Sequence, residues 1–446
     1  MKIELHDYDI YPKVFPVGVL AEITIKPQGV HSALVGEYKI VVQQLECGST
    51  VHEFSAWNHT DYEVSVCEDG CLRFAHTAHQ EGELVVRVYK KGSESRIVQL
   101  NLYALDADLA ERIPLRGDLH IHTCRSDGHS DPAIVCADYR MKGYDFLVIT
   151  DHGCYGPSLE AINAYKNIHT ALNILPGEEV HLPQTDVHIV NAGGLFSINA
   201  FAYGGDINTI RYDASVTAPV VVPSEQYTSE LEAIEATLTD IPADVNKRWY
   251  AVCVWAYEKI READGLCIFA HPYWIEDMYN VPEPLTKYML AKKPFDAFEV
   301  LGGECYYQQN GFQTALYYDE YRRGNVLPIV GSTDSHNSTE NSKKAAICST
   351  IVFAHKNDRK DILQSIKDRY SVAVDTISAE YRLVGEHRLQ KYACYLMENF
   401  YPLHDRAAYC DGELMRKYYL GDADASLVEA TATLAEKMLD KYFLVM

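Results

Sequence analysis

The sequence predicts an α/β protein in which a parallel sheet or barrel follows a small all-β domain. Its 446 residues exceed the size of one typical core and indicate two or three structural units. Residues up to about 110 alternate apolar and polar side chains without a helical period. Beyond that point, short apolar runs alternate with helical patterns, which is typical of parallel βα units.

The N-terminal segment, about 1–110, is predicted to be a β-sandwich. Gly, Asn and Asp residues separate its alternating stretches, as turns do between strands. We expect a linker at 106–114, where acidic residues interrupt the apolar pattern before the next strand. The stretches predicted to form strands are 21–28, 37–45, 61–67 and 83–104.

The central segment, about 114–380, carries the alternating strand and helix pattern. Asp131 is placed as a helix N-cap and Pro132 occupies the first turn, so a helix is expected from there to Lys142. Apolar runs recur between such helices, and each run is short enough to be a buried strand. The pattern therefore predicts a parallel sheet or a barrel as the core of this segment.

One stretch of the central segment does not fit a single βα unit. Residues 206–262 contain two helical patterns, 224–239 and 244–261, and are predicted to be a helical insertion near the mouth of a pocket. Such an insertion could act as a lid, but we favour scaffold packing. The C-terminal segment, 381–446, is predicted to be a helical, tyrosine-rich extension.

Two histidines one residue apart provide the clearest sign of chemistry. His120 and His122 lie on a predicted strand, where residues i and i+2 point to the same face. Imidazole nitrogens at that spacing suit zinc, manganese or iron. A single His-x-His motif is weak evidence by itself, so the interpretation depends on further ligands elsewhere in the chain.

Further candidate ligands follow other apolar strands. Strand ends are where a barrel or an open sheet gathers its functional side chains. Singly, each such residue is more often a helix cap or a turn residue. Between the two adjacent glutamates we prefer Glu179, because Glu178 would point the opposite way in an extended segment. The candidates are His152, Glu178 or Glu179, His188, His271, Asp334 and His336.

In this order, the motifs resemble those of the polymerase and histidinol phosphatase (PHP) superfamily. The resemblance spans about residues 116–376 and implies a distorted seven-stranded (β/α) barrel. It also implies two or three divalent ions at the carboxyl ends of the strands. The motifs are His120-x-His122, Ser126-Asp127-Gly128, Thr150-Asp151-His152, Gly177-x-Glu179, His188, His271-Pro272 and Asp334-x-His336.

The resemblance implies three groups of metal ligands, two of which share Glu179. The ions expected are zinc, manganese or iron. Family members often carry histidine at the position of Asp127, so the third group departs most from the usual pattern. The first group is His120, His122, Glu179 and Asp334, the second is Glu179, His188 and His271, and the third is Asp127, His152 and His336.

The net charge and the composition restrict the kinds of partner and substrate that the protein can bind. Lys and Arg number 40 against 63 Asp and Glu, a net charge of −23, which argues against nucleic acid as a stable partner. A small, anionic substrate remains compatible with this negative net charge, because bound divalent ions make the electrostatic potential at their site positive. Twelve cysteines, mostly in apolar segments, are typical of reduced thiols. With no signal peptide or membrane span apparent, we expect a cytoplasmic protein without a membrane partner.

The predicted chemistry is hydrolysis by a metal-activated water. Glu179 would bridge two ions and Asp334 would orient the water. Arg125, in the loop after His122, could hold a phosphate or carboxylate group, or be a solvated loop charge. Asp118 and Asp151 could orient histidine ligands, or could cap turns and helices instead.

Three functional classes follow from this chemistry. The favoured class is a phosphoesterase acting on a small phosphorylated metabolite, which is what the resemblance implies for most of the superfamily. The second is a hydrolase of a carbamate, ester or amide bond, because a branch of the superfamily also carries an N-terminal β domain. The third is a non-catalytic, metal-stabilised binding module, which the intact set of nine ligands disfavours.

Overall fold

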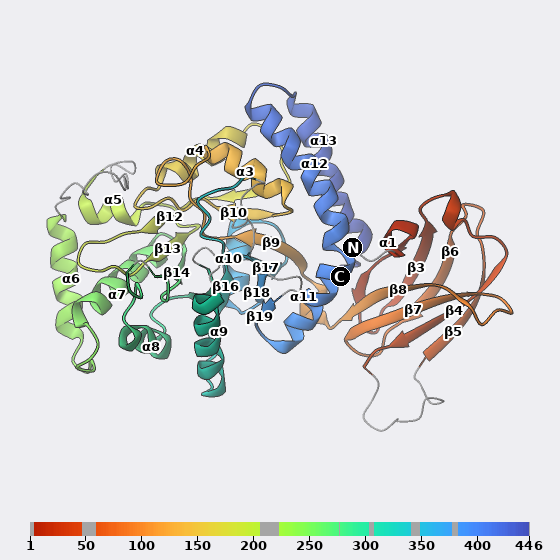
Figure 1. The fold of residues 1–446 in the computed structure, drawn as a ribbon, viewed down its shortest axis with the longest axis horizontal. Coiled ribbons are helices and arrows are strands. Elements are labelled where there is room, and N and C mark those ends of the chain that lie inside the picture. The colour runs from red at the N-terminus through yellow and green to blue at the C-terminus, as the bar shows by residue number, and fades with distance from the viewer. Residues whose placement is uncertain are drawn as a thin grey trace. The chain divides into compact units, whose positions relative to one another are not determined.

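The computed structural model describes residues 4–46, 59–205, 223–275, 277–302, 307–339, 348–376 and 382–445. The chain divides into two compact units (Figure 1). The first comprises Met1–Ile113, Gln390–Ala407 and Thr433–Met446, and the second comprises Pro114–Leu389 and Ala408–Ala432. Residues 381–446 are therefore shared between the two units and do not form a body of their own. None of the helices in the described ranges combines the length and the apolar character needed to cross a membrane.

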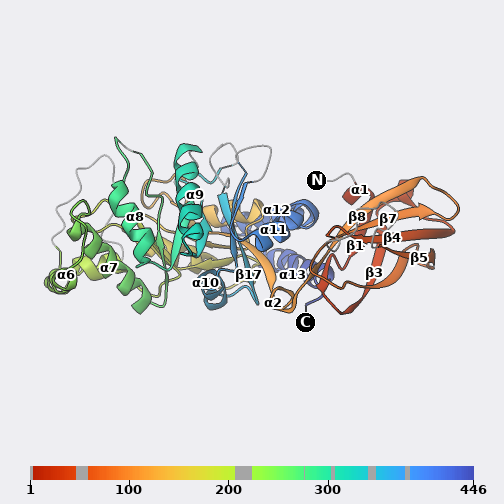
Figure 2. The same cartoon turned by 90° about the horizontal axis from the view of Figure 1, so that it is seen from below.

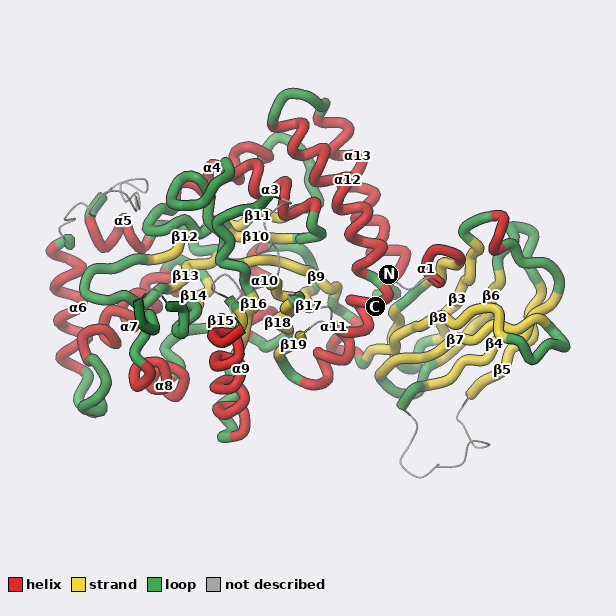
Figure 3. The backbone as a smooth tube through the Cα atoms, viewed as in Figure 1, coloured by secondary structure: helices red, strands yellow, loops and turns green. Residues whose placement is uncertain are grey.

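The N-terminal unit contains two sheets that share one apolar cluster. One sheet has the order β1-β3-β6 and the other β2-β8-β7-β4-β5. Buried residues of both enter the cluster, among them Ile23 from the first and Val86 from the second. Figure 3 shows this part of the chain to be mostly strand. The strands are β1 Tyr8–Tyr11, β2 Val14–Pro16, β3 Leu20–Pro27, β4 Glu37–Gln44, β5 His59–Ser65, β6 Leu72–Thr77, β7 Gly82–Lys90 and β8 Arg96–Leu105.

The alternation of buried and exposed side chains explains why some of these strands were predictable from the sequence. In β4, every second side chain is buried from Tyr38 to Gln44, which reproduces the apolar alternation of the sequence. The predicted strands in 21–45 and 61–104 correspond to β3, β4, β5, β7 and β8. The strands β1, β2 and β6 were not predicted, because the first two are too short to show a period. Short helices α1 (Glu4–Asp7) and α2 (Ala107–Ala110) flank the strands.

The second unit is mixed α/β and contains two further sheets. A six-stranded sheet has the order β11-β10-β9-β17-β18-β19, and a five-stranded sheet has the order β12-β13-β14-β15-β16. Their strands are β9 Ile113–Asp118, β10 Phe146–Val148, β11 Asn173–Leu175, β12 Gly177–Val180, β13 Ile189–Ala192, β14 Leu266–Phe269, β15 Ala297–Leu301, β16 Ile329–Gly331, β17 Cys348–Ala354, β18 Ser371–Asp375 and β19 Arg382–Val384.

The hydrogen-bonded ladders differ from those of an all-parallel, closed barrel. The strands β9, β10 and β11 pair in parallel, as do β14, β15 and β16, but β13 is antiparallel to both of its neighbours. Between the two sheets there are only isolated bridges in the described residues, Ile121 to Ser335 and His152 to Glu179. Continuous ladders therefore form two open sheets, and the predicted seven-stranded barrel is not seen as one closed ladder.

Helices cover the sheets of the second unit (Figure 2). As predicted, Asp131 caps α3, its side chain accepting a hydrogen bond from the backbone of Ala133 at 3.1 Å. The helices are α3 Pro132–Met141, α4 Gly156–Tyr165, α5 Ile198–Tyr203, α6 Glu225–Thr237, α7 Lys247–Glu262, α8 Glu283–Lys292, α9 Tyr307–Arg322 and α10 Arg359–Lys367, with α11 His387–Asn399, α12 Tyr401–Tyr419 and α13 Ala425–Tyr442 near the C-terminus.

The predicted helical insertion is partly a core element. Its residues 206–222 lie outside the described residues. The two predicted helices are observed as α6 and α7. Trp255 and Tyr257 of α7 are buried in the same apolar cluster as Phe269 of β14. The second half of the predicted insertion thus packs as scaffold.

Helix α12 approaches α3 closely within the second unit. Arg140 of α3 is buried and its Nε donates to Asp411 of α12 at 2.7 Å. A Cβ atom added at Gly412 would lie 2.4 Å from the backbone nitrogen of Met141 and 2.6 Å from the carbonyl oxygen of Ala137. This contact requires glycine, because backbone atoms cannot move aside as a flexible side chain can.

We expect Gly412→Ala to lower the free energy of unfolding by about 1–3 kcal/mol, through overpacking against α3. The matched control is Gly311→Ala in α9, where an added Cβ meets nothing within 4 Å. There, alanine should raise the stability by about 0.5–1 kcal/mol, because glycine loses more backbone entropy in a helix. Urea titration followed by circular dichroism measures both variants. Equal stability of the two variants would contradict the close contact.

Candidate metal centre

Glu179 lies at the centre of a cluster of histidines. It is on β12, its side chain is fully buried, and six imidazole nitrogens lie within 3.6 Å of its carboxylate oxygens. A carboxylate with so many nitrogen neighbours is suited to bridging metal ions. Oε1 lies 2.8 Å from Nδ1 of His188, 3.4 Å from Nε2 of His120 and 3.6 Å from Nε2 of His271, and Oε2 lies 2.6 Å from Nδ1 of His152, 3.4 Å from Nε2 of His181 and 3.5 Å from Nε2 of His122.

The first predicted ligand group comes together at the ends of β9 and β16. Oδ1 of Asp334 lies 2.8 Å from Nε2 of His122 and 3.3 Å from Nε2 of His120. Asp334 has a φ of 53°, a left-handed conformation that aspartate tolerates better than most residues. Its backbone N–H donates to the carbonyl of His120 at 2.9 Å. This bond holds the unusual backbone geometry beside the two histidines.

The second and third predicted groups flank the first. His188 precedes β13 and His271 follows β14, so that both rings reach Oε1 of Glu179. In the third group, Oδ2 of Asp127 lies 3.4 Å from Nε2 of His152 and Oδ1 lies 3.3 Å from Nε2 of His336. The structure therefore brings all nine predicted ligands together in one cluster of overlapping groups.

The hydrogen bonding of this cluster fits a metal site. Buried polar atoms in proteins nearly always have hydrogen-bond partners. Among the described residues, both oxygens of Glu179 have none, nor have Nε2 of His120, Nδ1 of His188 and both ring nitrogens of His271. Atoms of nitrogen and oxygen that converge in this way are the donor set that zinc, manganese or iron would accept.

Burial keeps part of the cluster ready for metal binding. Burial lowers the pKa of His122 and the pKa of His188 to about 3, so these two rings are neutral at neutral pH. Burial opposes ionisation of Glu179, but the surrounding imidazoles outweigh it and hold the pKa of this carboxyl well below its usual range. Neutral imidazole and ionised carboxylate are the forms that coordinate metal ions.

Glu299 is a member of the cluster that was not predicted from the sequence. Its carboxylate is fully buried in β15, and Oε2 lies 3.0 Å from Nδ1 of His120. A carboxylate on the second ring nitrogen sets the tautomer and orientation of a histidine ligand. The available signal was a single acidic residue inside the apolar strand Ala297–Leu301.

Asp118 and Asp151, proposed as possible partners of histidine ligands, instead bind turns. Asp118 accepts hydrogen bonds from the backbone and hydroxyl of Thr333, and burial raises its pKa to about 7. Asp151 accepts hydrogen bonds from Thr123 and Ser126 and so fixes the loop before Asp127. Both carboxylates position the backbone of the ligands and do not contact their rings in any hydrogen bond between described residues.

Glu178 points away from the cluster, as alternation along β12 predicts. Its carboxylate accepts hydrogen bonds from Ser197 at 2.8 Å, from the Nδ2 of Asn199 at 3.1 Å and from the backbone N–H of Ile198. These residues form the start of α5. Glu178 therefore anchors this helix, and Glu179 alone of the pair faces the histidines.

Arg125 lies apart from the metal groups. Its guanidinium donates to both carboxylate oxygens of Glu160, at 2.8 and 2.5 Å, and its side chain is 42% exposed. The hydrogen bonds with Glu160 raise the pKa of Arg125 further above its usual value. Arg125 is not among the described residues that line the cavity over the histidines. The structure thus supports the alternative of a surface loop charge.

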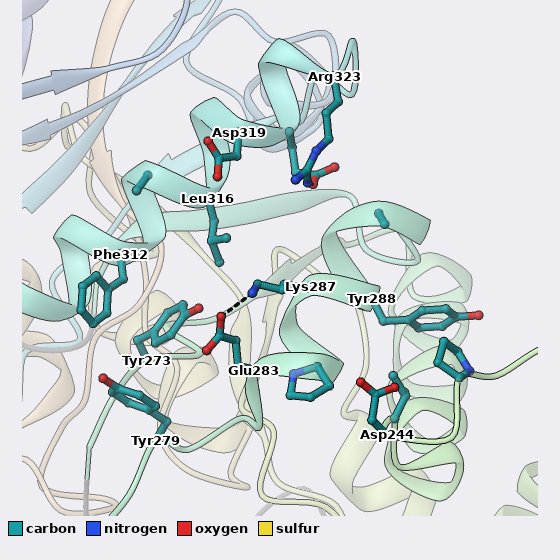
Figure 4. A pocket seen from close by; sticks show the side chains of 16 residues that line it. Asp244, Tyr273, Tyr279, Glu283, Lys287, Tyr288, Phe312, Leu316, Asp319 and Arg323 are labelled. Atoms are coloured by element: carbon teal, nitrogen blue, oxygen red, sulfur yellow. Dashed lines mark hydrogen bonds and ion pairs between the residues drawn. The ribbon is translucent and has the colours of Figure 1, made fainter.

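The histidine cluster opens onto a cavity of about 640 Å³. Trp274, three residues after His271, lines this cavity, whereas the hydroxyl of Tyr155, three residues after His152, donates to the backbone carbonyl of Gly194. Tyr273 lines a second cavity of about 840 Å³, where Glu283 and Lys287 form an ion pair (Figure 4). Tyr279 lines both cavities.

No protein-family model and no curated protein sequence matches this chain. Solved structures give weak matches. A two-domain protein from Bacteroides vulgatus, described as containing a PHP-like metal-dependent phosphoesterase, is 16% identical over 59% of this chain, with a TM-score of 0.37. The match covers 65% of that protein, so the chain spans less than two thirds of its length.

Two further structures cover about half of this chain. A metal-dependent phosphoesterase from Bifidobacterium adolescentis is 18% identical over 51% of this chain and 90% of its own, with a TM-score of 0.32. An amidohydrolase from Chromobacterium violaceum is 17% identical over 51% of this chain and 89% of its own, with a TM-score of 0.30.

Proposed function

We propose that this chain is a metal-dependent hydrolase of the PHP superfamily, and that it is a phosphoesterase acting on a small phosphorylated metabolite. The observation that carries the proposal is the buried Glu179 carboxylate, which has six imidazole nitrogens within 3.6 Å and no hydrogen-bond partner among the described residues. The cluster opens onto a cavity large enough for a small metabolite.

The isolated bridges support a distorted barrel as the scaffold. Ile121, beyond β9, bridges to Ser335, beyond β16, and His152, beyond β10, bridges to Glu179 of β12. Together with the ladders from β12 to β16, these contacts are what a distorted barrel of seven strands would require: β9, β10, β12, β13, β14, β15 and β16. Two of the predicted ligands, His152 and Glu179, form one of these bridges.

The residues divide into holding and orienting roles. Divalent ions, when bound, would activate a water and polarise the scissile group. His120, His122 and Asp334 would hold one ion with Glu179, while Glu299 keeps His120 in the required tautomer. Asp334 also faces the cavity, where its carboxylate can orient a water for attack.

Hydrolysis of a carbamate, ester or amide bond is the second candidate. The specific observation that favours it is that no lysine or arginine is among the described residues lining the cavity, whereas Asp186 and Asp277 are. A phosphate group there would depend on the ions and the imidazoles for its neutralisation. A less charged substrate would need less neutralisation by groups in the cavity.

Elemental analysis provides the first test. We expect two to three divalent ions per chain, of zinc, manganese or iron according to supply, because nine nitrogen- and oxygen-bearing ligands converge. Protein purified without chelator is measured before and after incubation with each metal. Less than one ion per chain after such incubation would contradict the metal centre.

A turnover screen separates the two candidate reactions. Metal-loaded protein is assayed on generic phosphate esters beside carbamate and aryl esters, with chelator-treated protein as the control. Phosphate release without acyl turnover supports the phosphoesterase, and the reverse pattern supports the second candidate. No turnover in protein shown to hold its metal would leave a non-catalytic binding module.

A further inference from the structure

His181 belongs to the cluster but not to the nine predicted ligands. Its Nε2 atom lies 2.7 Å from Nδ1 of His152, in hydrogen-bonding geometry. Glu179 is also close, with Oε2 2.6 Å from the same nitrogen of His152, but in the described residues neither of its oxygens has hydrogen-bonding geometry to a partner. Nδ1 of His152 therefore has hydrogen-bonding geometry to His181.

The two ring nitrogens of His152 face different partners. Nε2 lies 3.4 Å from Oδ2 of Asp127, on the side of the third ligand group, whereas Nδ1 faces His181. A neutral histidine that offers Nε2 to a metal carries its proton on Nδ1 and needs an acceptor for it. His181 is placed to accept that proton through Nε2.

We propose that His181 is a positioning residue that fixes His152 in the tautomer that the third metal group requires. The inference rests on the proposed metal centre and deepens it. By accepting from Nδ1 of His152, His181 directs Nε2 toward Asp127 and His336. It also leaves the carboxylate of Glu179 available as the bridge between the other two groups.

The backbone of His181 is held in place for this role. Its N–H donates to Oδ1 of Asn199 at 3.1 Å, and its carbonyl accepts from the hydroxyl of Tyr203 at 3.2 Å. Both partners belong to α5, the helix that Glu178 anchors. Glu178 and Glu179 thus act on opposite sides of β12, one anchoring the helix that holds His181 and one facing the metal groups.

Metal titration of the full chain tests the role. Wild type, His181→Ala, His181→Gln and the exposed control His169→Ala are titrated with Mn²⁺ or Zn²⁺ against a competing chelator, and metal content is measured after dialysis. We expect His181→Ala to weaken the third ion about 10- to 100-fold while the first two stay bound. His181→Gln keeps an acceptor near the position of Nε2 and should restore most of that affinity.

The outcomes separate the inference from the proposed function. If wild-type protein binds no ion, the proposed metal centre is wrong. If it binds only two ions, the third ligand group is wrong. If wild type binds three ions and His181→Ala binds them equally well, the positioning role alone is wrong. If the His181→Ala and His181→Gln variants lose the third ion equally, His181 is a direct ligand of that ion instead. Thermal unfolding of metal-free variants shows whether each has folded.

Discussion

Replacing Glu179 with glutamine is expected to remove two metal ions together. The amide preserves the shape of the side chain but removes the negative charge that two ligand groups share. His120 and His122 would then share only the carboxylate of Asp334, and His188 and His271 would lose the carboxylate of Glu179. Metal content after dialysis should fall by about two ions per chain, and turnover should fall by at least about a hundredfold.

Two further variants show whether this loss is specific. His152→Ala should empty mainly the third group, because Nε2 of His152 faces Asp127. Glu262→Gln, on α7, removes a glutamate whose side chain is 57% exposed and should leave metal content and turnover unchanged. Full metal content in both Glu179→Gln and His152→Ala would show that the grouping of the ligands is wrong.

The second large effect is expected at Asp334. The Asp334→Asn variant should lose about a hundred- to a thousandfold in the rate of phosphate release, or about 2.7–4 kcal/mol of transition-state stabilisation. The physical reason is that the carboxylate contacts both His120 and His122 and faces the cavity, so it can hold an ion and orient water. Asparagine also tolerates the left-handed backbone at this position, so the fold should be retained.

The exposed Asp240→Asn variant is the matched control and should keep the wild-type rate. His120→Ala should lose turnover as Asp334→Asn does. Initial rates are measured on a phosphate ester with metal-loaded protein. If the acyl substrates are the ones turned over, the same mutational losses are expected there. A rate for Asp334→Asn within a fewfold of wild type would remove this carboxylate from the chemistry.

Local sequence patterns predicted those strands and helices whose formation depends on residues close together in the chain. Alternation located β4 and its buried face, and an N-cap followed by proline located α3. Alternation also separated Glu178 from Glu179, because successive side chains on a strand must point to opposite faces. Strand ends followed by His or Asp marked the residues that the structure now brings together.

Contacts between distant segments could not be read in this way. Glu299 reaches His120 across 179 residues of sequence, and Arg140 pairs with Asp411 on a C-terminal helix expected to be a separate extension. His181 was one histidine among 18 until the fold placed it beside His152. Arg125 lies in the loop between His122 and Asp127, but the fold places Glu160 beside it, and its guanidinium donates to that carboxylate.

The types of candidate ligand and their order along the chain were predictable from local sequence patterns. They were predictable because strand alternation and strand ends fix the direction of a side chain within a few residues. Which ring nitrogen lies beside which carboxylate, and which acidic residues bind turns instead, became visible in the folded chain. Those pairings depend on distances between strands far apart in sequence, and on a burial that leaves Glu179 without hydrogen-bond partners among the described residues.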